Sequence, residues 1–430
     1  MIVANASSIS YPWVKIYGGQ YKDGFNQIIN TSDRGFALVG YTASYRNGTS
    51  NVWLVKVDRQ GDVQWDRTYG GLGESSGNSI VQTIDGGYAI TGYSTSYGDG
   101  SWNIYLVRTD STGDVLWNRT YRSTELGYAL DISTLPDGGF ILAGVAYTDN
   151  GIAKACVIKT DANGNETWDK TYGGARKDEA HFVAPADDGG FIVAGYTQSF
   201  GNLNGDFFVN GTGDAWLLKI DARGNEQWNR TYGGDAVDDA YYVIQSADGG
   251  YLFGGMTRSF SNDSDRAYLV KTDSRGNEQW HRTFGNNSSD AIYAIKKAAD
   301  GFVLAGTMYP RTGNSKTFLI NVDNQGNKTW GYSYGENGDY CGYSICNGVD
   351  SGYMIAGTMN STANSNNMNS DGFIFKVNGD GTPVIVIDNS IANDSQSSGQ
   401  ILPVTIFLVL VIIACLGIAA LTLKKWILKK

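Results

Sequence analysis

The sequence predicts an all-β fold: a seven-bladed β-propeller of four-stranded antiparallel blades, followed by one C-terminal transmembrane helix. Three observations predict it: a tryptophan repeat, short β-rich runs between Gly and Asp turns, and an uncharged apolar tail. The tryptophans recur at intervals of 52, 52, 51, 60, 52 and 50 residues, at Trp13, Trp65, Trp117, Trp168, Trp228, Trp280 and Trp330. A period of about 40 to 50 residues is typical of propellers. Residues 13–387 are therefore expected to form one repeat array.

Composition supports short strands and excludes some functions. The chain has 57 Gly and only 6 Pro among 430 residues, which suits strands joined by tight turns. Its net charge of −10 argues against nucleic acid, which requires a basic surface. The four cysteines are too sparse for a disulfide framework or a zinc site, so those in the repeats are expected to be unpaired core residues: Cys156, Cys341 and Cys346.

One repeat shows how a blade is built. In the second repeat, β-rich runs begin at Asn78, Tyr88, Ile104 and Val115, and we call these strands a, b, c and d. Asp85-Gly86-Gly87 joins a to b, and an Asp-x-x-Gly turn from Asp110 to Gly113 joins c to d. Asp-Gly is a strong hairpin signal because Gly adopts positive φ without steric cost. The recurring aspartates are therefore predicted to form turns rather than to bind metal.

Ring closure follows from counting strands. Seven a–b–c triplets are present, but the first tryptophan strand, at Trp13, precedes them all. We expect it to pair with the last triplet, residues 338–378, because closure removes exposed sheet edges. The alternative is closure by residues 383–387, which occupy the d register with Ile385 in place of tryptophan.

The seven tryptophans are predicted to pack between adjacent blades, where large aromatic side chains contribute much of the buried area. The alternative role is docking of a quinone cofactor.

The repeat motifs identify a resemblance. They include Thr231-Tyr232-Gly233-Gly234, Asp188-Gly189-Gly190-Phe191 with Gly195-Tyr196-Thr197, and Trp216-Leu217-Leu218-Lys219. From Trp13 to about Gly381 the chain resembles the repeats of secreted or cell-surface β-propellers of archaea and bacteria. The resemblance implies an envelope location. The turns are also similar to quinoprotein and sialidase repeats, but both of those motifs differ from this one by one residue in spacing.

The C-terminal segment predicts a membrane anchor. Residues 401–423 carry no charge and are long enough to span a bilayer, and residues 424–430 form a basic cytoplasmic tail. Residues 388–400 read as a polar linker, and residues 1–12 as an N-terminal segment without a visible signal peptide. Thirteen Asn-x-Ser/Thr sequons favour an extracellular propeller. The alternative is a tail-anchored cytoplasmic scaffold.

The b–c loops are the predicted binding region because they vary from repeat to repeat, whereas the a–b and c–d turns do not. The longest loop, residues 198–214, accounts for the 60-residue repeat. Its candidate ligand-binding residues are Asp206, Phe207, Phe208 and Asp214.

A second candidate site is a ring of carboxylates that precede strand a: Asp23, Glu74, Glu125, Glu179, Asp239, Asp290 and Asp339. If strand a lines the channel, oxygen ligands from Asp23, Glu179, Asp239, Asp290 and Asp339 suit Ca²⁺. The alternative is that they are solvated turn residues. Neither His181 nor His281 is predicted to be catalytic, and His181 is expected to be structural.

The predicted function is a membrane-anchored extracellular binding or adhesion module for a surface glycan or a protein ligand. One alternative is an envelope enzyme that acts on polysaccharide through the channel-mouth carboxylates. The other is the cytoplasmic scaffold.

Overall fold

The computed structural model describes residues 9–388, apart from residue 47 and residues 98–99, 123–125, 202–212, 262–263, 286–287, 336–337 and 362–368. The chain divides into two compact units, Pro12–Val384 and Met1–Tyr11 with Ile385–Lys430. The predicted membrane span 401–423 and basic tail 424–430 lie outside the described residues. Within the described residues, no helix is long and apolar enough to cross a membrane.

Seven four-stranded antiparallel sheets form the unit Pro12–Val384, which confirms the predicted seven-bladed propeller. The first three blades are β3 (Asp23–Asn30), β4 (Phe36–Thr42), β5 (Asn51–Val57) and β6 (Val63–Tyr69); β7 (Ser75–Gln82), β8 (Tyr88–Ser94), β9 (Asn103–Thr109) and β10 (Val115–Tyr121); and β11 (Gly127–Thr134), β12 (Phe140–Tyr147), β13 (Ala153–Thr160) and β14 (Glu166–Tyr172). The next three are β15 (Asp178–Pro185), β16 (Phe191–Thr197), β17 (Asp214–Ile220) and β18 (Glu226–Tyr232); β19 (Asp238–Gln245), β20 (Tyr251–Thr257), β21 (Arg266–Thr272) and β22 (Glu278–Phe284); and β23 (Ser288–Ala298), β24 (Gly301–Pro310), β25 (Lys316–Val322) and β26 (Lys328–Tyr334). The seventh is β27 (Gly338–Asn347), β28 (Tyr353–Ser361), β29 (Asp371–Val377) and β2 (Val14–Tyr17).

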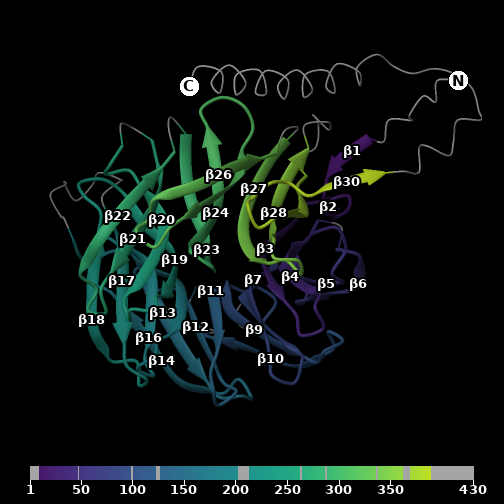
Figure 1. Ribbon diagram of the computed structural model, residues 1–430. Helices are drawn as coiled ribbons and strands as arrows, with labels where there is room; N and C mark the ends of the chain where they lie inside the picture. Colours follow the sequence, from purple (N-terminus) through teal and green to yellow (C-terminus); the bar gives the residue numbers. More distant parts are fainter. Residues whose placement is uncertain are drawn as a thin grey trace, which may run out of the picture. The chain divides into compact units, whose positions relative to one another are not determined.

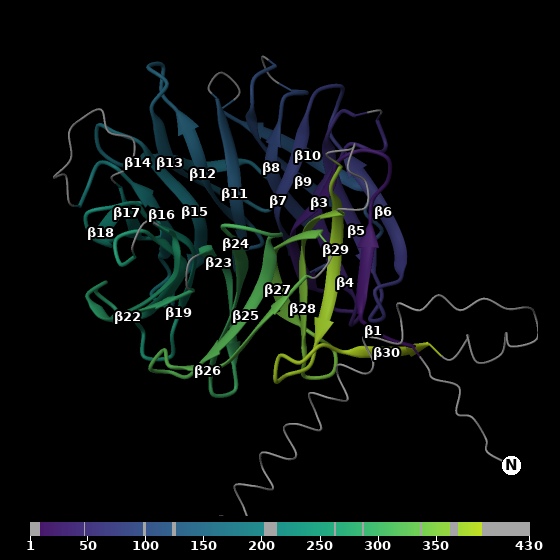
Figure 2. The same ribbon diagram turned by 90° about the horizontal axis from the view of Figure 1, so that it is seen from above.

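Strand a is the innermost strand of every blade. The strands β3, β7, β11, β15, β19, β23 and β27 contact one another in succession, and β27 returns to contact β3. Figures 1 and 2 show the blades following one another around a common centre. The inner strands therefore surround the centre of the ring.

The N-terminal strand closes the ring, as predicted. β2 pairs antiparallel with β29, with Val14 opposite Phe375 and Tyr17 opposite Gly372. The alternative closing strand does not join the blade. Instead, β30 (Ile385–Asp388) pairs with β1 (Ile9–Pro12) in a separate two-stranded sheet.

Each blade is locked to the next by its tryptophan and by the c–d turn of its neighbour. A Cβ atom on Gly113 would lie 2.7 Å from the Trp65 ring, so the indole packs directly on that turn. The tyrosine four residues later, Tyr69, donates a hydrogen bond of 2.8 Å to the carbonyl of Gly113. The turn glycine has φ of 83°, a conformation that L side chains rarely adopt.

The tryptophan–glycine contact recurs around the whole ring, at Trp13–Gly61, Trp65–Gly113, Trp117–Gly164, Trp168–Gly224, Trp228–Gly276, Trp280–Gly326 and Trp330–Gly381. The hydrogen bond from the tyrosine hydroxyl to the carbonyl of the turn glycine recurs at Tyr17, Tyr121, Tyr172, Tyr232 and Tyr334, with distances of 2.5 to 2.8 Å. Phe284 stands in place of the tyrosine in the fifth blade and has no hydroxyl to donate. The tryptophans therefore lie between blades, where the sequence analysis expected them.

Replacement of Trp117 by alanine is expected to lower the free energy of unfolding by about 3–5 kcal/mol, the usual cost of truncating a core aromatic residue. The indole lies edge-on to Phe140 at 6.3 Å and packs on Gly164, so its loss leaves a cavity between two blades. Urea unfolding followed by circular dichroism measures the change. Leu116→Ala is the matched control, because Leu116 is exposed on the same strand and is expected to change stability by less than about 0.5 kcal/mol. Equal effects of the two variants would contradict the interlocking role.

Candidate functional site

The connections between strands are similar from blade to blade on one face of the propeller and differ on the other. The a–b and c–d turns share one face, which we call the turn face. Here the aspartate of the a–b turn pairs with a strand-c cation, in the pairs Asp33–Lys56, Asp85–Arg108, Asp137–Lys159, Asp188–Lys219, Asp248–Lys271 and Asp350–Lys376. The c–d aspartates accept backbone hydrogen bonds within their own turns, as Asp221 does from Arg223 and Asn225 at 2.8 Å. These turn aspartates are structural, as predicted.

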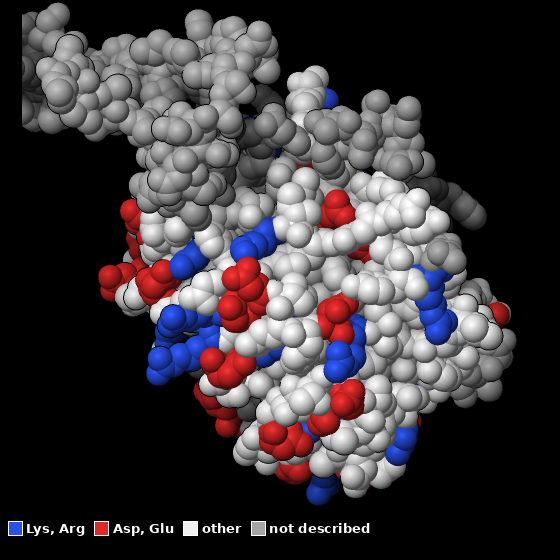
Figure 3. All heavy atoms as spheres, turned by 90° about the vertical axis from the view of Figure 1, so that its right-hand side faces the viewer, with Lys and Arg blue, Asp and Glu red and all other residues white. Residues whose placement is uncertain are grey.

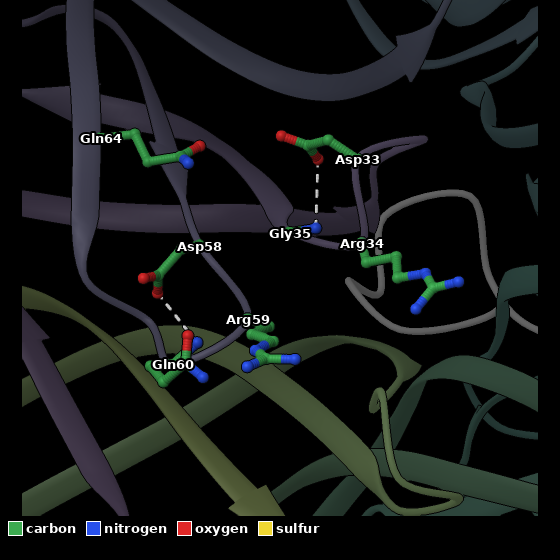
Figure 4. Close-up of a pocket in the computed structure, with 7 residues that line it drawn as sticks. All are labelled: Asp33, Arg34, Gly35, Asp58, Arg59, Gln60 and Gln64. Carbon is green, nitrogen blue, oxygen red and sulfur yellow. Dashed lines mark hydrogen bonds between the residues drawn. The ribbon is translucent and has the colours of Figure 1, made fainter.

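A hollow of about 310 Å³ lies on the turn face of the first blade. Figure 4 shows its lining, in which Asp33 accepts a hydrogen bond from the Gly35 backbone and Asp58 accepts one from Gln60. Asp33 also pairs with Lys56 at 2.8 Å, and the equivalent pair forms in other blades. The hollow is therefore a product of the repeated turns rather than a specific site.

The opposite face carries the b–c loops and the d–a connections, and we call it the loop face. In the fourth blade, the buried carboxylate of Asp178 accepts hydrogen bonds from Thr197 Oγ1 at 2.5 Å and Ser199 Oγ at 2.7 Å. It also accepts the backbone N–H of Gly174 at 3.0 Å. This set of bonds, which we call the loop clip, ties the base of the b–c loop to the d–a connection.

The loop clip recurs in blades whose b–c loops differ in sequence. The equivalent groups are Asp23, Thr42 and Ser44 in the first blade and Asp238, Thr257 and Ser259 in the fifth. In the second blade, Ser75 Oγ donates a hydrogen bond of 2.8 Å to Ser94 Oγ, and Ser96 Oγ accepts hydrogen bonds from two backbone N–H groups. The sequence analysis missed this device, although the signal is present: an aspartate five residues after Tyr-Gly is followed by Gly-x-Thr-x-Ser.

Replacement of Asp178 by alanine is expected to destabilise the protein by about 1–3 kcal/mol for each buried hydroxyl that it leaves unpaired. Faster amide hydrogen exchange is expected at residues 198–201, because the loop base loses its anchor. Asp187→Ala, an exposed position in the a–b turn of the same blade, is the control and should stay within about 0.5 kcal/mol. Unchanged exchange in Asp178→Ala would show that the loop base is held by other contacts.

The predicted ligand-binding residues belong to the loop above this clip. Asp206, Phe207 and Phe208 lie outside the described residues. Asp214 is buried at the first position of β17, opposite Thr197. A Cβ atom on Gly201 would overlap its Oδ2 atom, so Asp214 lies at the base of the loop rather than at its tip.

The predicted carboxylate ring is divided among three positions in the strand register. Positions are counted so that the β-bulge of each inner strand falls at position four, because β23 and β27 begin two residues earlier than the other inner strands. Asp23 and Asp290 then occupy the first position, Glu179 and Asp239 the second, and Asp339 the one before the first. Asp23 is fully buried and is held by Thr42 and Ser44, and Asp339 accepts the backbone N–H of Ser315 at 2.7 Å. Glu125 lies outside the described residues. In the part of the chain that the structure describes, no three His, Cys, Asp or Glu side chains are grouped so as to hold a metal ion.

Glu179 and Asp239 do converge, on His181. The His181 Nε2 atom lies 3.3 Å from Glu179 Oε2, and its Nδ1 atom lies 3.2 Å from Asp239 Oδ1. Burial alone would lower the pKa of His181, but the carboxylates of Asp239 and Glu179 raise it to about 10. Lys177 adds a further contact of 3.0 Å to Glu179. The imidazolium thus occupies the position between two carboxylates that a cation would otherwise take.

His181 also begins an arc of aromatic side chains at the centre of the ring. Every inner strand has a β-bulge at its fourth position, occupied by Asn26, Asn78, Leu130, His181, Tyr241, Tyr293 and Tyr343. All seven are half-buried. The His181 and Tyr241 rings stack at 5.4 Å, and Tyr241 stacks on Tyr293 at 5.2 Å. These stacked rings link the inner strands of the fourth, fifth and sixth blades, and Tyr343 extends the arc to the seventh through a nearly perpendicular contact with Tyr293 at 5.4 Å.

An open ring face occurs elsewhere on the loop face, at Trp102. This tryptophan lies outside the repeat, directly before β9, and 43% of its surface is exposed. It stacks on Tyr93 at 4.7 Å with an interplanar angle of 21°, and the Tyr128 ring lies 6.2 Å away at an angle of 75° to the indole. The sequence analysis did not single out Trp102, although a tryptophan in a variable loop, out of register with the repeat, is a usable signal.

On the side shown in Figure 3, acidic and basic side chains are interspersed among uncharged residues and form no extended area of one sign.

No family model matches the sequence. A stretch is 26% identical over 164 residues to the regulatory protein FlaEY of Caulobacter vibrioides; it covers 34% of this chain and spans only 17% of that protein. Among solved structures, the chain is similar to Sqt1 of Chaetomium thermophilum, with 11% identity, 82% of this chain and 84% of that chain covered, and a TM-score of 0.49. It is also similar to the Pan2 WD40 domain of Neurospora crassa, with 9% identity, 82% and 89% covered, and a TM-score of 0.49.

Proposed function

We propose that this protein is a membrane-anchored extracellular binding module that engages a surface glycan or a protein ligand through its loop face. The observation that carries the proposal is the loop clip, which holds b–c loops of different sequence on the same rigid base. Variable loops on a rigid scaffold are the usual arrangement of binding sites in repeat proteins.

Binding is favoured over catalysis by the state of the central histidine. Both ring nitrogens of His181 face carboxylates, and the protonated form is favoured well above neutral pH. A general base needs an unprotonated nitrogen near the working pH. Glu179 and Asp239, the best-placed carboxylate pair for an enzyme, are bridged by this imidazolium.

The extracellular location is supported by the resemblance of the repeats to surface propellers and by the positions of the sequons. Asn30, Asn165 and Asn327 are exposed, and all three lie at or beside turns of the turn face. Glycans there would cover part of the turn face, whereas other sequons, such as Asn210 and Asn262, fall in the b–c loops. The uncharged segment 401–423 supports the membrane anchor.

Mass-spectrometric mapping of the protein from its native membrane tests this location. Modified Asn30, Asn165 and Asn327 are the expected result. A wholly unmodified chain, from a host that glycosylates its surface proteins, would favour the cytoplasmic scaffold instead.

Replacement of residues 202–212 by a short Gly-Ser linker tests the binding role. We expect the full-length variant in detergent to lose its affinity for isolated envelopes of the host, while its unfolding curve stays unchanged. The control is Ile84→Ala, a fully exposed residue of the turn face. Envelope binding that persists after this loop and the b–c loop 362–368 are both replaced would refute the proposal.

A further inference from the structure

Trp102 is held as a rigid, outward-facing platform between the second and third blades. Its backbone carbonyl accepts a hydrogen bond of 2.7 Å from the N–H of Gly127, the first residue of β11. Tyr93 covers one face of the indole, and the Tyr128 ring packs nearly perpendicular to it. The indole is exposed in part although it is supported on two sides, so a ligand meets a preorganised flat surface rather than a mobile side chain.

The size of the exposed apolar patch indicates a small ligand. The neighbouring apolar side chain is Leu126, which is 49% exposed. Two exposed side chains are far less than the roughly 800 Å² that each partner buries in a stable protein interface. The platform has room for one flat ring of a ligand.

The polar surroundings indicate a neutral, hydroxyl-rich ligand. Burial has the largest effect on the pKa of Tyr93 and of Tyr128, and raises both. The carboxylate of Glu74 raises the pKa of Tyr93 further, and the carboxylate of Glu179 does the same for Tyr128. Glu74 also lies beside Tyr93 in the strand register, because it is two residues before Ser76, which pairs with Tyr93. Glu74 is exposed, so its carboxylate can accept a hydrogen bond from a hydroxyl group, and it repels an anionic ligand. Glu179 is already paired with Lys177 and His181.

We propose that Trp102, with Tyr93 behind it and Tyr128 beside it, is a stacking subsite for the pyranose ring of a neutral hexose glycan. The C–H groups on one face of a pyranose carry partial positive charge and pack on the negative face of the indole. A ring hydroxyl then donates to Glu74. This subsite rests on the proposed binding function and specifies its ligand as carbohydrate.

The test is isothermal titration of the full-length protein in detergent with cellotetraose, maltotetraose and chitotetraose as separate probes. At least one probe is expected to bind, and Trp102→Ala is expected to weaken that binding at least about tenfold. Trp102→Phe, which keeps a flat ring, should retain most of the affinity, and Ile84→Ala on the turn face should retain all of it. Near-ultraviolet circular dichroism checks that each variant is folded.

The subsite is overturned if none of the three probes binds the wild-type protein, or if Trp102→Ala binds as tightly as the wild type. Binding of an apolar peptide, but of no oligosaccharide, at Trp102 would likewise overturn it in favour of a protein ligand. The proposed function is tested separately. Envelope binding that survives in Trp102→Ala but is lost on loop replacement would remove only the carbohydrate subsite. Envelope binding that survives both changes would remove the proposed function itself.

Discussion

Deletion of residues 1–18 is expected to abolish the cooperative unfolding of the propeller. The deletion removes β2, and with it the fourth strand of the last blade, so the edge of β29 becomes unpaired. It also removes Trp13 and Tyr17, whose contacts with the Gly61 turn join the last blade to the first. The loss should exceed the about 3–5 kcal/mol of a single core aromatic truncation, against a typical total stability of about 5–15 kcal/mol.

Thermal and urea unfolding, followed by tryptophan fluorescence and near-ultraviolet circular dichroism, measure this loss. A broad transition with a lower midpoint and greater aggregation is expected. Deletion of residues 1–8 is the control, because it leaves β1, β2 and Trp13 in place. An unchanged, sharp transition after deletion of residues 1–18 would mean that another segment closes the ring.

Replacement of His181 by glutamine is expected to lower the free energy of unfolding by about 3–5 kcal/mol at neutral pH, the usual cost of removing one partner from a buried charge pair. The side chains of His181, Glu179 and Asp239 are only 13%, 12% and 12% exposed. The variant leaves two buried carboxylates without the cation between them, and it also ends the stack on Tyr241. Urea unfolding measures the change.

His281 provides a matched control, because it is the other histidine of the chain. Its imidazole pairs with Glu278 at 2.7 Å, but its side chain is 37% exposed. His281→Gln is expected to change stability by less than about 0.5 kcal/mol. Equal effects of the two substitutions would show that the central pair adds no stability.

The pH dependence of the same pair has a definite sign. The folded-state pKa of His181 is raised from 6.5 to about 10, so the folded state binds the proton more tightly than the unfolded state. The stabilisation is fully present below about pH 6.5 and is lost as the pH rises to about 10. The stability difference between the wild type and His181→Gln should therefore shrink across this window. A constant difference would mean that the imidazole is neutral in the folded protein.

The fold was predictable because its signals are local and repeated. The tryptophan spacing, the Asp-Gly turns and the early position of Trp13 together predicted seven blades and the strand that closes them. Each signal depends on turn geometry or on one side chain per repeat. None of them requires knowledge of contacts between distant residues. The ligand-binding role of the longest b–c loop, with its candidate residues Phe207 and Phe208, stays a prediction.

The candidate site was predictable only in part, because it depends on register. Asp23 and Glu179 both precede or begin a strand in the sequence, yet they differ by one position. Neighbouring residues of a strand point to opposite sides, so Asp23 lies buried in the loop clip while Glu179 reaches His181. The bulge at the fourth position of each inner strand, which carries His181 and the tyrosines, has no clear signature in the spacing.

The sequence by itself determined the repeat, the number of blades, the turn aspartates and the packing role of the tryptophans, because these follow from short-range chemistry that is the same in every repeat. The tertiary structure alone decided which carboxylates meet and that an imidazolium lies between two of them. It also decided that Trp102 keeps an open face while the central rings cover one another. The contact between His181 and Asp239 joins neighbouring blades, and a register difference of one residue would remove it. The rings around Trp102 come from two blades and do not follow the repeat.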